Sequence, residues 1–229
     1  MPLGTIVNAV AVIAGSLVGM LLRRGVPERL RGIIFEGIGL VTLVIGMLNA
    51  LEIDSPSHLM TVIFSVLIGG LLGEWARLEE RLEHLGDWLK AKAKSRDARF
   101  TEGLVTAFLI FCIGPMTLMG ALDEGLSGDA SLLYAKSILD LFMSMALAST
   151  FGLGVLFSFI PLLIFQAGIT LLGLGVGNVV SEVMISQLTA VGGVLILGLG
   201  ISILGLKKLR VASLLPALVV IVVLTLIFG

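Results

Sequence analysis

Residues 141–181, "LFMSMALASTFGLGVLFSFIPLLIFQAGITLLGLGVGNVVS", contain no charged side chain. As one continuous helix this stretch would be about 60 Å long, roughly twice the thickness of the hydrocarbon core of a bilayer. The chain must therefore turn back inside it. Pro161 is the expected place, because proline interrupts the helical hydrogen bonds and restrains the residue before it. A re-entrant segment is the alternative.

The composition extends this conclusion to the whole chain. Hydrophobic residues make up 57% of the 229 residues and charged residues 14%, about half the charged fraction of a soluble domain. The apolar blocks are continuous and lack the strict alternation of a membrane barrel. We predict an all-α polytopic membrane protein with about eight transmembrane helices. The expected spans are residues 3–22, 33–51, 58–76, 103–121, 132–157, 160–179, 187–206 and 211–228.

The basic residues predict the orientation of these spans. Fourteen of the fifteen lysines and arginines follow the first, third and seventh spans, and the loops between hold none. Because cytoplasmic loops are enriched in positive charge, we expect a multi-pass protein of the cytoplasmic (inner) membrane with both termini outside. Lys136 is the one exception.

The loop that follows the third span has a pattern of its own. In "EWARLEERLEHLGDWLKAKAKSR" (residues 74–96), apolar side chains recur at spacings of three and four. This pattern predicts an amphipathic cytoplasmic helix over residues 77–95, lying on the inner leaflet. A regulatory or partner-binding helix is the alternative.

Two pairs of segments indicate an internal repeat. "NAVAVIAGSLVGM" from Asn8 matches "QAGITLLGLGVGN" from Gln166, and "GIGLVTLVIGM" matches "VGGVLILGLGI". The aligned glycines are Gly15 with Gly173, Gly19 with Gly177, Gly39 with Gly193, and Gly46 with Gly200. Repeat one would cover residues 3–76 and repeat two residues 160–228, with connecting spans at 103–157.

The two copies begin five spans apart, so they must face opposite ways across the membrane. Inverted repeats of this kind are typical of secondary transporters. Glycines four residues apart, such as Gly69 and Gly73, are also explained by close helix packing. Such faces favour a homodimer as well.

The charged pair Lys136 and Asp140 lies one helical turn apart in the fifth span, so the two side chains can pair. Charged residues at membrane depth are costly and usually mark ion or substrate pathways. We therefore expect Asp140 to be a cation or proton site, with Lys136 as its counter-charge. In the alternative, Lys136 reaches outward to the interface and merely caps Asp140.

Further polar residues are candidates for ion or solute binding. Asn8 and Gln166 occupy matched places in the repeat, where their amides either coordinate a ligand or bond across helices. Glu36, in the first turn of the second span, either handles ions or sits harmlessly near the interface. In "FCIGPMTLMGALDEG", Gly114-Pro115 predicts a broken helix with free carbonyls around residue 111. Thr117 adds a hydroxyl near the break.

Several function classes are excluded or disfavoured. The chain lacks the H-E-x-x-H, G-x-S-x-G, Walker and dinucleotide-binding motifs, so we expect no enzyme. A net charge of −1 gives no basic surface for nucleic acid, and one cysteine with two scattered histidines predicts no transition-metal site. No cofactor is expected, apart from Na⁺ or H⁺ as a coupling ion.

The stretches "GTIVNAVAVIAGSLVG", "FCIGPMTLMGALDEGLSGD", "AKSILD" and "IPLLIFQAGITLL" resemble the bacterial membrane-protein family named domain of unknown function 554. The resemblance runs nearly end to end and is most specific from Phe111 to Asp140. It implies a multi-span membrane protein without a defined substrate. It draws attention to Gly114, Pro115, Asp123, Gly125, Gly128, Asp129, Lys136, Asp140 and Gln166.

The leading hypothesis is a secondary transporter for a small cation or a small polar solute such as an amino acid. Its partners would be the lipid bilayer, the transported solute and a second copy of the chain. A passive ion channel and a membrane interaction protein that does not transport are the alternatives.

Overall fold

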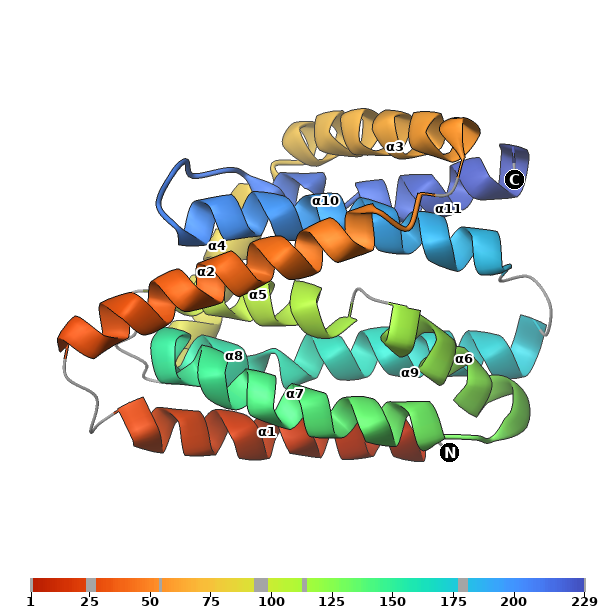
Figure 1. Cartoon of the computed structure of the whole chain (residues 1–229). Helices are drawn as coiled ribbons and strands as arrows, with labels where there is room; N and C mark the ends of the chain where they lie inside the picture. The colour runs from red at the N-terminus through yellow and green to blue at the C-terminus, as the bar shows by residue number, and fades with distance from the viewer. Residues whose placement is uncertain are drawn as a thin grey trace. The chain divides into compact units, whose positions relative to one another are not determined.

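The computed structural model describes residues 2–23, 28–53, 55–92, 99–112, 115–176 and 181–228. Within these ranges the regular structure is entirely helical, and Figure 1 shows the order of the helices. They are α1 (Leu3–Arg23), α2 (Glu28–Ala50), α3 (Pro56–Trp75), α4 (Leu78–Lys92), α5 (Phe100–Cys112), α6 (Pro115–Ser127), α7 (Ser131–Phe151), α8 (Leu153–Phe157), α9 (Phe159–Val176), α10 (Glu182–Ile203), the short 3-10 helix η1 (Val211–Leu214) and α11 (Ala217–Phe228).

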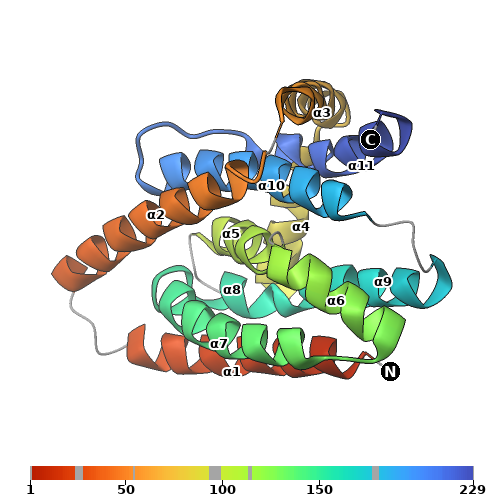
Figure 2. The ribbon, with the colours of Figure 1, turned by 45° about the vertical axis from the view of Figure 1, so that its right-hand side comes forward.

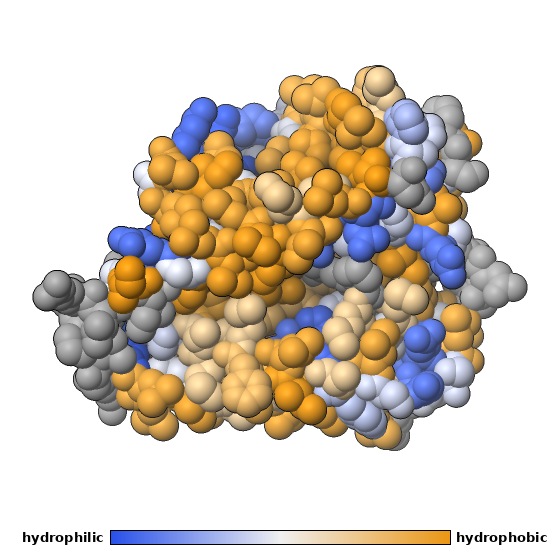
Figure 3. Space-filling view, viewed as in Figure 1, coloured by the Kyte–Doolittle hydropathy of each residue, from blue (hydrophilic) through white to orange (hydrophobic). Residues whose placement is uncertain are grey.

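The helices have the length and composition of membrane spans. Among the described residues, five are long and apolar enough to cross a membrane, or six if the bent pair α5–α6 is one span. Residues 36–50 and 211–227 form shorter apolar helices. Large apolar side chains are exposed along most of these helices and cover much of the face seen in Figure 3. The all-helical membrane class is confirmed, whereas the number of eight spans stays a prediction.

The chain divides into two compact units, and each combines two segments that are separate in the sequence. Unit 1 comprises Met1–Ile34 and Gly86–Val179, and unit 2 comprises Phe35–Leu85 and Val180–Gly229. In unit 1, α1 lies alongside α7 (Figures 1 and 2) and α6 packs on α9. In unit 2, α11 packs on both α3 and α10.

In unit 1, glycines allow α1 and α7 to approach at backbone distance. A side chain at Gly15 would strike the carbonyl oxygen of Leu141, and one at Gly19 would strike that of Met145. Because the contacting residue numbers rise together, the two helices run in the same direction. Glycine is needed at both positions because any Cβ would overlap a backbone atom.

In unit 2, glycines of both partners line the contact between α2 and α10. The contacts are Gly39 with Leu204, Gly46 with Leu197, Gly200 with Leu43, and Gly193 with Ala50. Residue numbers rise along α2 as they fall along α10, so these two helices are antiparallel. Each glycine of one helix packs against a larger residue, leucine or alanine, of the other helix.

The chain reverses at Gly152, so the turn predicted at Pro161 is wrong. α7 ends at Phe151, and Gly152 has a φ of +70°, which favours glycine. The following apolar segment runs from Leu153 to Leu174 as one candidate span. Pro161 lies in the first turn of α9, where the missing N–H of proline would have no partner within the helix. The expected fifth span therefore ends earlier than residue 157.

The amphipathic helix expected at residues 77–95 corresponds to α4, and residues 93–95 lie outside the described ranges. In unit 2, the first turns of α4 lie against the segment that precedes α11. Glu79 accepts a hydrogen bond from the backbone N–H of Ala212 at 3.1 Å, and Lys208 Nζ lies 3.5 Å from Glu83 Oε1. Partial burial raises the pKa of Glu79. The contacts of α4 with protein are thus made by its acidic residues, and the expectation that its apolar stripe lies on the inner leaflet stays a prediction.

Gly46→Ala is expected to destabilise the protein by about 1–3 kcal/mol, the usual cost of overpacking. The added methyl group would lie 2.6 Å from the backbone nitrogen of Leu197, which cannot move aside alone. Gly37→Ala, on the same helix, is the control because no described atom lies within 4 Å of its Cβ position. Thermal unfolding in detergent would compare the two variants. Equal unfolding temperatures would contradict the tight α2–α10 contact.

Candidate functional site

A buried ion pair on α7 is the centre of the candidate site in unit 1. Lys136 Nζ lies 2.7 Å from Asp140 Oδ1 and 2.8 Å from Oδ2, so both carboxylate oxygens accept from the same ammonium group. Lys136 is 7% exposed and Asp140 4% exposed. Lys136 therefore does not reach outward to the interface. The pair forms because residues four apart on a helix share one face.

Two other helices of unit 1 line this ion pair. Lys136 Nζ lies 6.0 Å from the centre of the Phe111 ring on α5. Asn8 on α1 lies beside the Asp140 carboxylate, yet no hydrogen bond of ordinary geometry joins the Asn8 amide to any described group. Asn8 is fully buried. The pair thus sits among α1, α5 and α7, with an amide that has unused bonding capacity.

The matched amide on α9, Gln166, is in the same condition. It is fully buried, and neither its oxygen nor its nitrogen has a hydrogen-bond partner among the described residues. The Asn8 amide lies against the Asp140 carboxylate of α7, where the alternative of a bond across helices would place it, whereas Gln166 makes no hydrogen bond to any described residue. Leaving a buried polar group unpaired costs about 1–3 kcal/mol, and such groups usually pair with bound water or ligand. Both amides therefore keep bonding capacity for a polar partner.

The predicted helix break separates α5 from α6, whose axes differ by 59°. Gly114 lies outside the described residues, and Pro115 begins α6. The hydroxyl of Thr117 donates a hydrogen bond to the carbonyl oxygen of Phe111 at 2.8 Å. The expected free carbonyl at residue 111 is therefore satisfied within the chain. Thr117 stabilises the bend instead of facing a ligand with a free hydroxyl.

Glu36 is exposed on α2 and lies in unit 2, whereas the ion pair lies in unit 1. α2 begins at Glu28, but its apolar part covers residues 36–50. Glu36 therefore begins the apolar part of the helix, which agrees with its expected place in the first turn of the second span.

The candidate packing glycines are covered by other helices of the same chain. Gly15 and Gly19 face α7, Gly69 and Gly73 face Ala217 and Ser213, and Gly173 faces Gly125 of α6. Gly177 lies outside the described residues. The glycine faces that we expected to hold a homodimer together are thus used for packing inside the chain.

Comparison with known proteins places the chain in a family. The sequence profile described as "Protein of unknown function (DUF554)" matches residues 3–226. The chain belongs to the DUF554 family. It is 36% identical over 219 residues to "Uncharacterized membrane protein YdfK" of Bacillus subtilis (strain 168), covering 95% of this chain and 93% of that protein. It is 33% identical over 225 residues to "Uncharacterized protein YqgA" of Escherichia coli (strain K12), covering 95% and 94%. No solved structure matches.

Two of the residues highlighted by the DUF554 resemblance shape the turn between α6 and α7. Gly128 has a φ of +76°, and its N–H bonds to the carbonyl of Glu124, which ends α6. The exposed carboxylate of Asp129 accepts hydrogen bonds from the side chain and N–H of Ser131, and these bonds lower the pKa of Asp129. Both residues have a structural explanation that requires no ligand.

The sequence analysis missed a second buried acid, Glu124 on α6. It is 6% exposed, and its Oε1 accepts a hydrogen bond from the N–H of Gly4 at 2.6 Å. Its Oε2 lies 3.4 Å from the Thr5 hydroxyl and 3.5 Å from the Thr170 hydroxyl. The carboxylate therefore ties α6 to the N-terminus of α1 and to α9.

A signal for Glu124 was present in the sequence. Thr117, Ala121 and Glu124 have the spacing of one helix face, and all three are buried. Asp123, which the resemblance singled out, is exposed. Helical periodicity extended from the break would have chosen the inward-facing acid of the two.

Removing one partner of the ion pair should be far more costly than removing both. Asp140→Leu leaves the Lys136 ammonium buried without counter-charge, which we expect to destabilise the protein by about 3–5 kcal/mol. The double variant Lys136→Met/Asp140→Leu should recover most of that loss, because an apolar pair of similar size replaces the ions. Unfolding of the single and double variants in detergent would measure the coupling. A double variant as unstable as Asp140→Leu would argue against a buried pair.

Glu124→Ala is expected to destabilise the protein by about 1–3 kcal/mol, because the N–H of Gly4 would lose its acceptor. Asp123→Ala, one residue away and exposed, is the matched control and should change stability by less than about 0.5 kcal/mol. The two unfolding temperatures would be compared under identical detergent conditions. A similar loss in both variants would show that Glu124 does not bridge these helices.

Proposed function

We propose that the chain is a secondary transporter that moves a small polar solute or small cation across the cytoplasmic membrane, coupled to Na⁺ or H⁺. The observation that carries the proposal is the polar assembly buried in unit 1. It comprises the Lys136–Asp140 pair, the Asn8 amide beside it and the bent helix pair α5–α6, and unit 1 also buries the Gln166 amide. Ionisable groups at membrane depth typically mark solute pathways, and interrupted helices commonly form the sites of secondary transporters.

The proposal includes an inverted repeat, and the contact between α2 and α10 supports it. Gly46 faces Leu197, and Gly200 faces Leu43. Equivalent residues of the two helices differ by the same number: Gly200 follows Gly46 by 154 residues, and Leu197 follows Leu43 by 154 residues. The contacts of Gly39 and Gly193 obey the same shift. Each contact is therefore made twice with the partners exchanged, as a two-fold axis between antiparallel helices requires.

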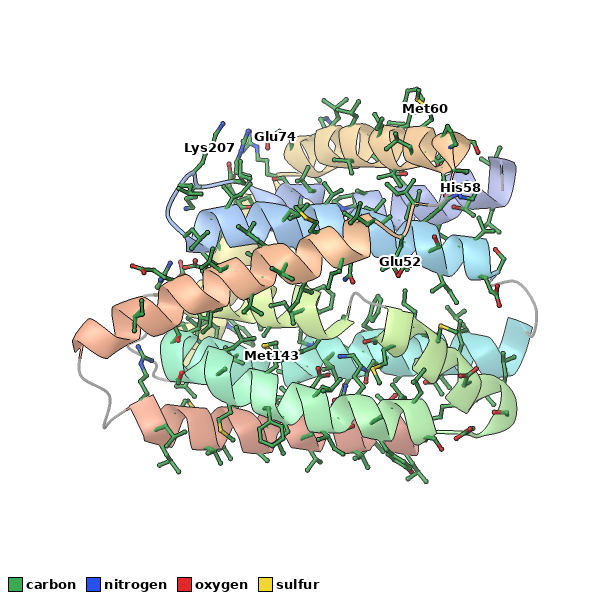
Figure 4. The ribbon with its side chains drawn as sticks, in the orientation of Figure 1. Glu52, His58, Met60, Glu74, Met143 and Lys207 are labelled. Carbon is green, nitrogen blue, oxygen red and sulfur yellow. The ribbon has the colours of Figure 1, made fainter. Side chains whose placement is uncertain are left out.

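The proposed eight crossings and orientation have independent support in the helix directions. α1 runs parallel to α7, and α2 runs antiparallel to α10, as alternation across eight spans demands. In Figure 4, Glu74 and Lys207 lie at one end of unit 2, whereas Glu52 and His58 lie toward the other. By the positive-inside rule the end with Lys207, Lys208 and Arg210 is cytoplasmic. Both termini are then outside.

Purified protein in liposomes should accumulate solute only when a Na⁺ or H⁺ gradient is imposed. Pools of labelled amino acids, amines and small sugars would serve as probes, against liposomes without protein. We expect uptake by Asp140→Asn and by the double variant Lys136→Met/Asp140→Leu to be at least ten-fold lower than uptake by the natural protein. Asp123→Asn, an exposed acid on α6, should leave it unchanged.

Three outcomes would count against the proposal. Undiminished uptake by folded Asp140→Asn would remove this carboxylate from the mechanism. Currents in planar bilayers far above one ion per conformational cycle would identify a channel instead. Absence of gradient-driven uptake with every pool would exclude transport of these solutes.

A further inference from the structure

From the charges of the site we infer that it binds a zwitterion, a solute with one ammonium and one carboxylate group such as a neutral α-amino acid. This inference rests on the proposed transport function and deepens it by naming the class of solute. It depends on three features of unit 1: a closed ion pair, its low exposure and the neutral Asn8 amide beside it, with Gln166 as a second buried amide.

The ion pair is neutral as a whole, and its charges satisfy each other. Both oxygens of Asp140 lie within hydrogen-bonding distance of Lys136 Nζ. A cation that took over Asp140 would leave the Lys136 ammonium unpaired beside another positive charge. An anion that took over Lys136 would leave the Asp140 carboxylate unpaired. Either ligand strands a charge in a site where both side chains are less than a tenth exposed, which costs several kcal/mol.

A zwitterion avoids this cost. Its carboxylate pairs with Lys136 and its ammonium pairs with Asp140, so one internal ion pair is exchanged for two pairs with the solute. Every charge keeps a counter-charge throughout. The exchange needs the two side chains to separate, and lysine is suited to this because its charge lies at the end of a flexible four-carbon stem. Asp140, with its short side chain, stays in place.

The amides fit the same class of solute. The free polar atoms of Asn8 and Gln166 include two donor groups and two acceptor oxygens. Such groups bind a solute that itself both donates and accepts hydrogen bonds, and they add no net charge. Asn8 lies beside the Asp140 carboxylate, where the ammonium group of the solute would bind.

The test compares three pools that share the same neutral side chains and differ only in charge. Free L-amino acids are zwitterions, amino acid amides are cations and N-acetyl amino acids are anions at pH 6, since α-amino groups titrate near 8. Thermal unfolding of the full-length protein in detergent would be followed as each pool is titrated. We expect the zwitterion pool to stabilise the protein at concentrations at least ten-fold lower than either charged pool.

Charge variants sharpen this test. Lys136→Met should shift the preference toward the amides, and Asp140→Leu should shift it toward the N-acetyl pool. The double variant Lys136→Met/Asp140→Leu, with no charge to strand, should fold and respond to none of the pools at concentrations that stabilise the natural protein. The comparison of pools on the natural protein stands even where a single variant fails to fold.

The outcomes separate this inference from the proposed function. An equal or stronger response to a charged pool, or no response to any pool, would overturn the zwitterion assignment. Gradient-driven uptake of another solute would then still support the proposed transport function. If the zwitterion pool stabilised the protein but was not taken up by liposomes, the binding site would be supported and the transport function would be contradicted.

Discussion

A polar group inside a hydrocarbon layer is costly unless it has a hydrogen-bond or charge partner, and most of the polar contacts described above supply such a partner. Helices satisfy the backbone within each span. Where the ladder is interrupted, side chains replace it: the Thr117 hydroxyl bonds to the Phe111 carbonyl, and the Glu124 carboxylate receives the N–H of Gly4. The Asn8 and Gln166 amides are buried without a hydrogen bond of ordinary geometry among the described residues, as are the hydroxyls of Ser16, Thr106, Thr189 and Ser213. Asn8 differs from the others because it lies beside the buried ion pair.

The same constraint explains why a lysine and an aspartate occur together in an apolar span. Either charge alone would be expensive at this depth, and the two at one helical turn neutralise each other. Close neutralisation also limits what the site can bind. A ligand with a single charge breaks the pair at the expense of one member, whereas a ligand with both charges does not. The chemistry of the pair thus disfavours the simple cation site expected from Asp140 alone.

Hydropathy in the sequence was enough to predict the helical class and the approximate place of every apolar segment, because span length follows from bilayer thickness. It could not predict the reversal at Gly152. Both Gly152 and Pro161 disrupt helices in principle, and only three-dimensional packing decides which of them is the corner. It also could not show that the glycine faces of α1 and α3 are covered within the chain. Sequence identifies a small residue but not the partner that approaches it. The family resemblance highlighted the exposed Asp123 and not the adjacent Glu124, although helical spacing from Thr117 and Ala121 predicts that Glu124 is the buried one of the two acids.

The placement of the ion pair within the proposed two-copy architecture bears on how transport would work. The glycine contacts between α2 and α10 are duplicated, and the proposed repeat also pairs Asn8 of α1 with Gln166 of α9. Lys136 and Asp140, however, lie on α7, outside both proposed copies. A symmetric framework can adopt two related packings of similar energy, one open to each side of the membrane. A single asymmetric ion pair then provides one binding site per chain for both packings. In the proposed transporter the framework would supply the movement and the pair the selectivity, so substitutions in α7 should alter what is bound, whereas substitutions at the α2–α10 glycines should alter whether the protein can move.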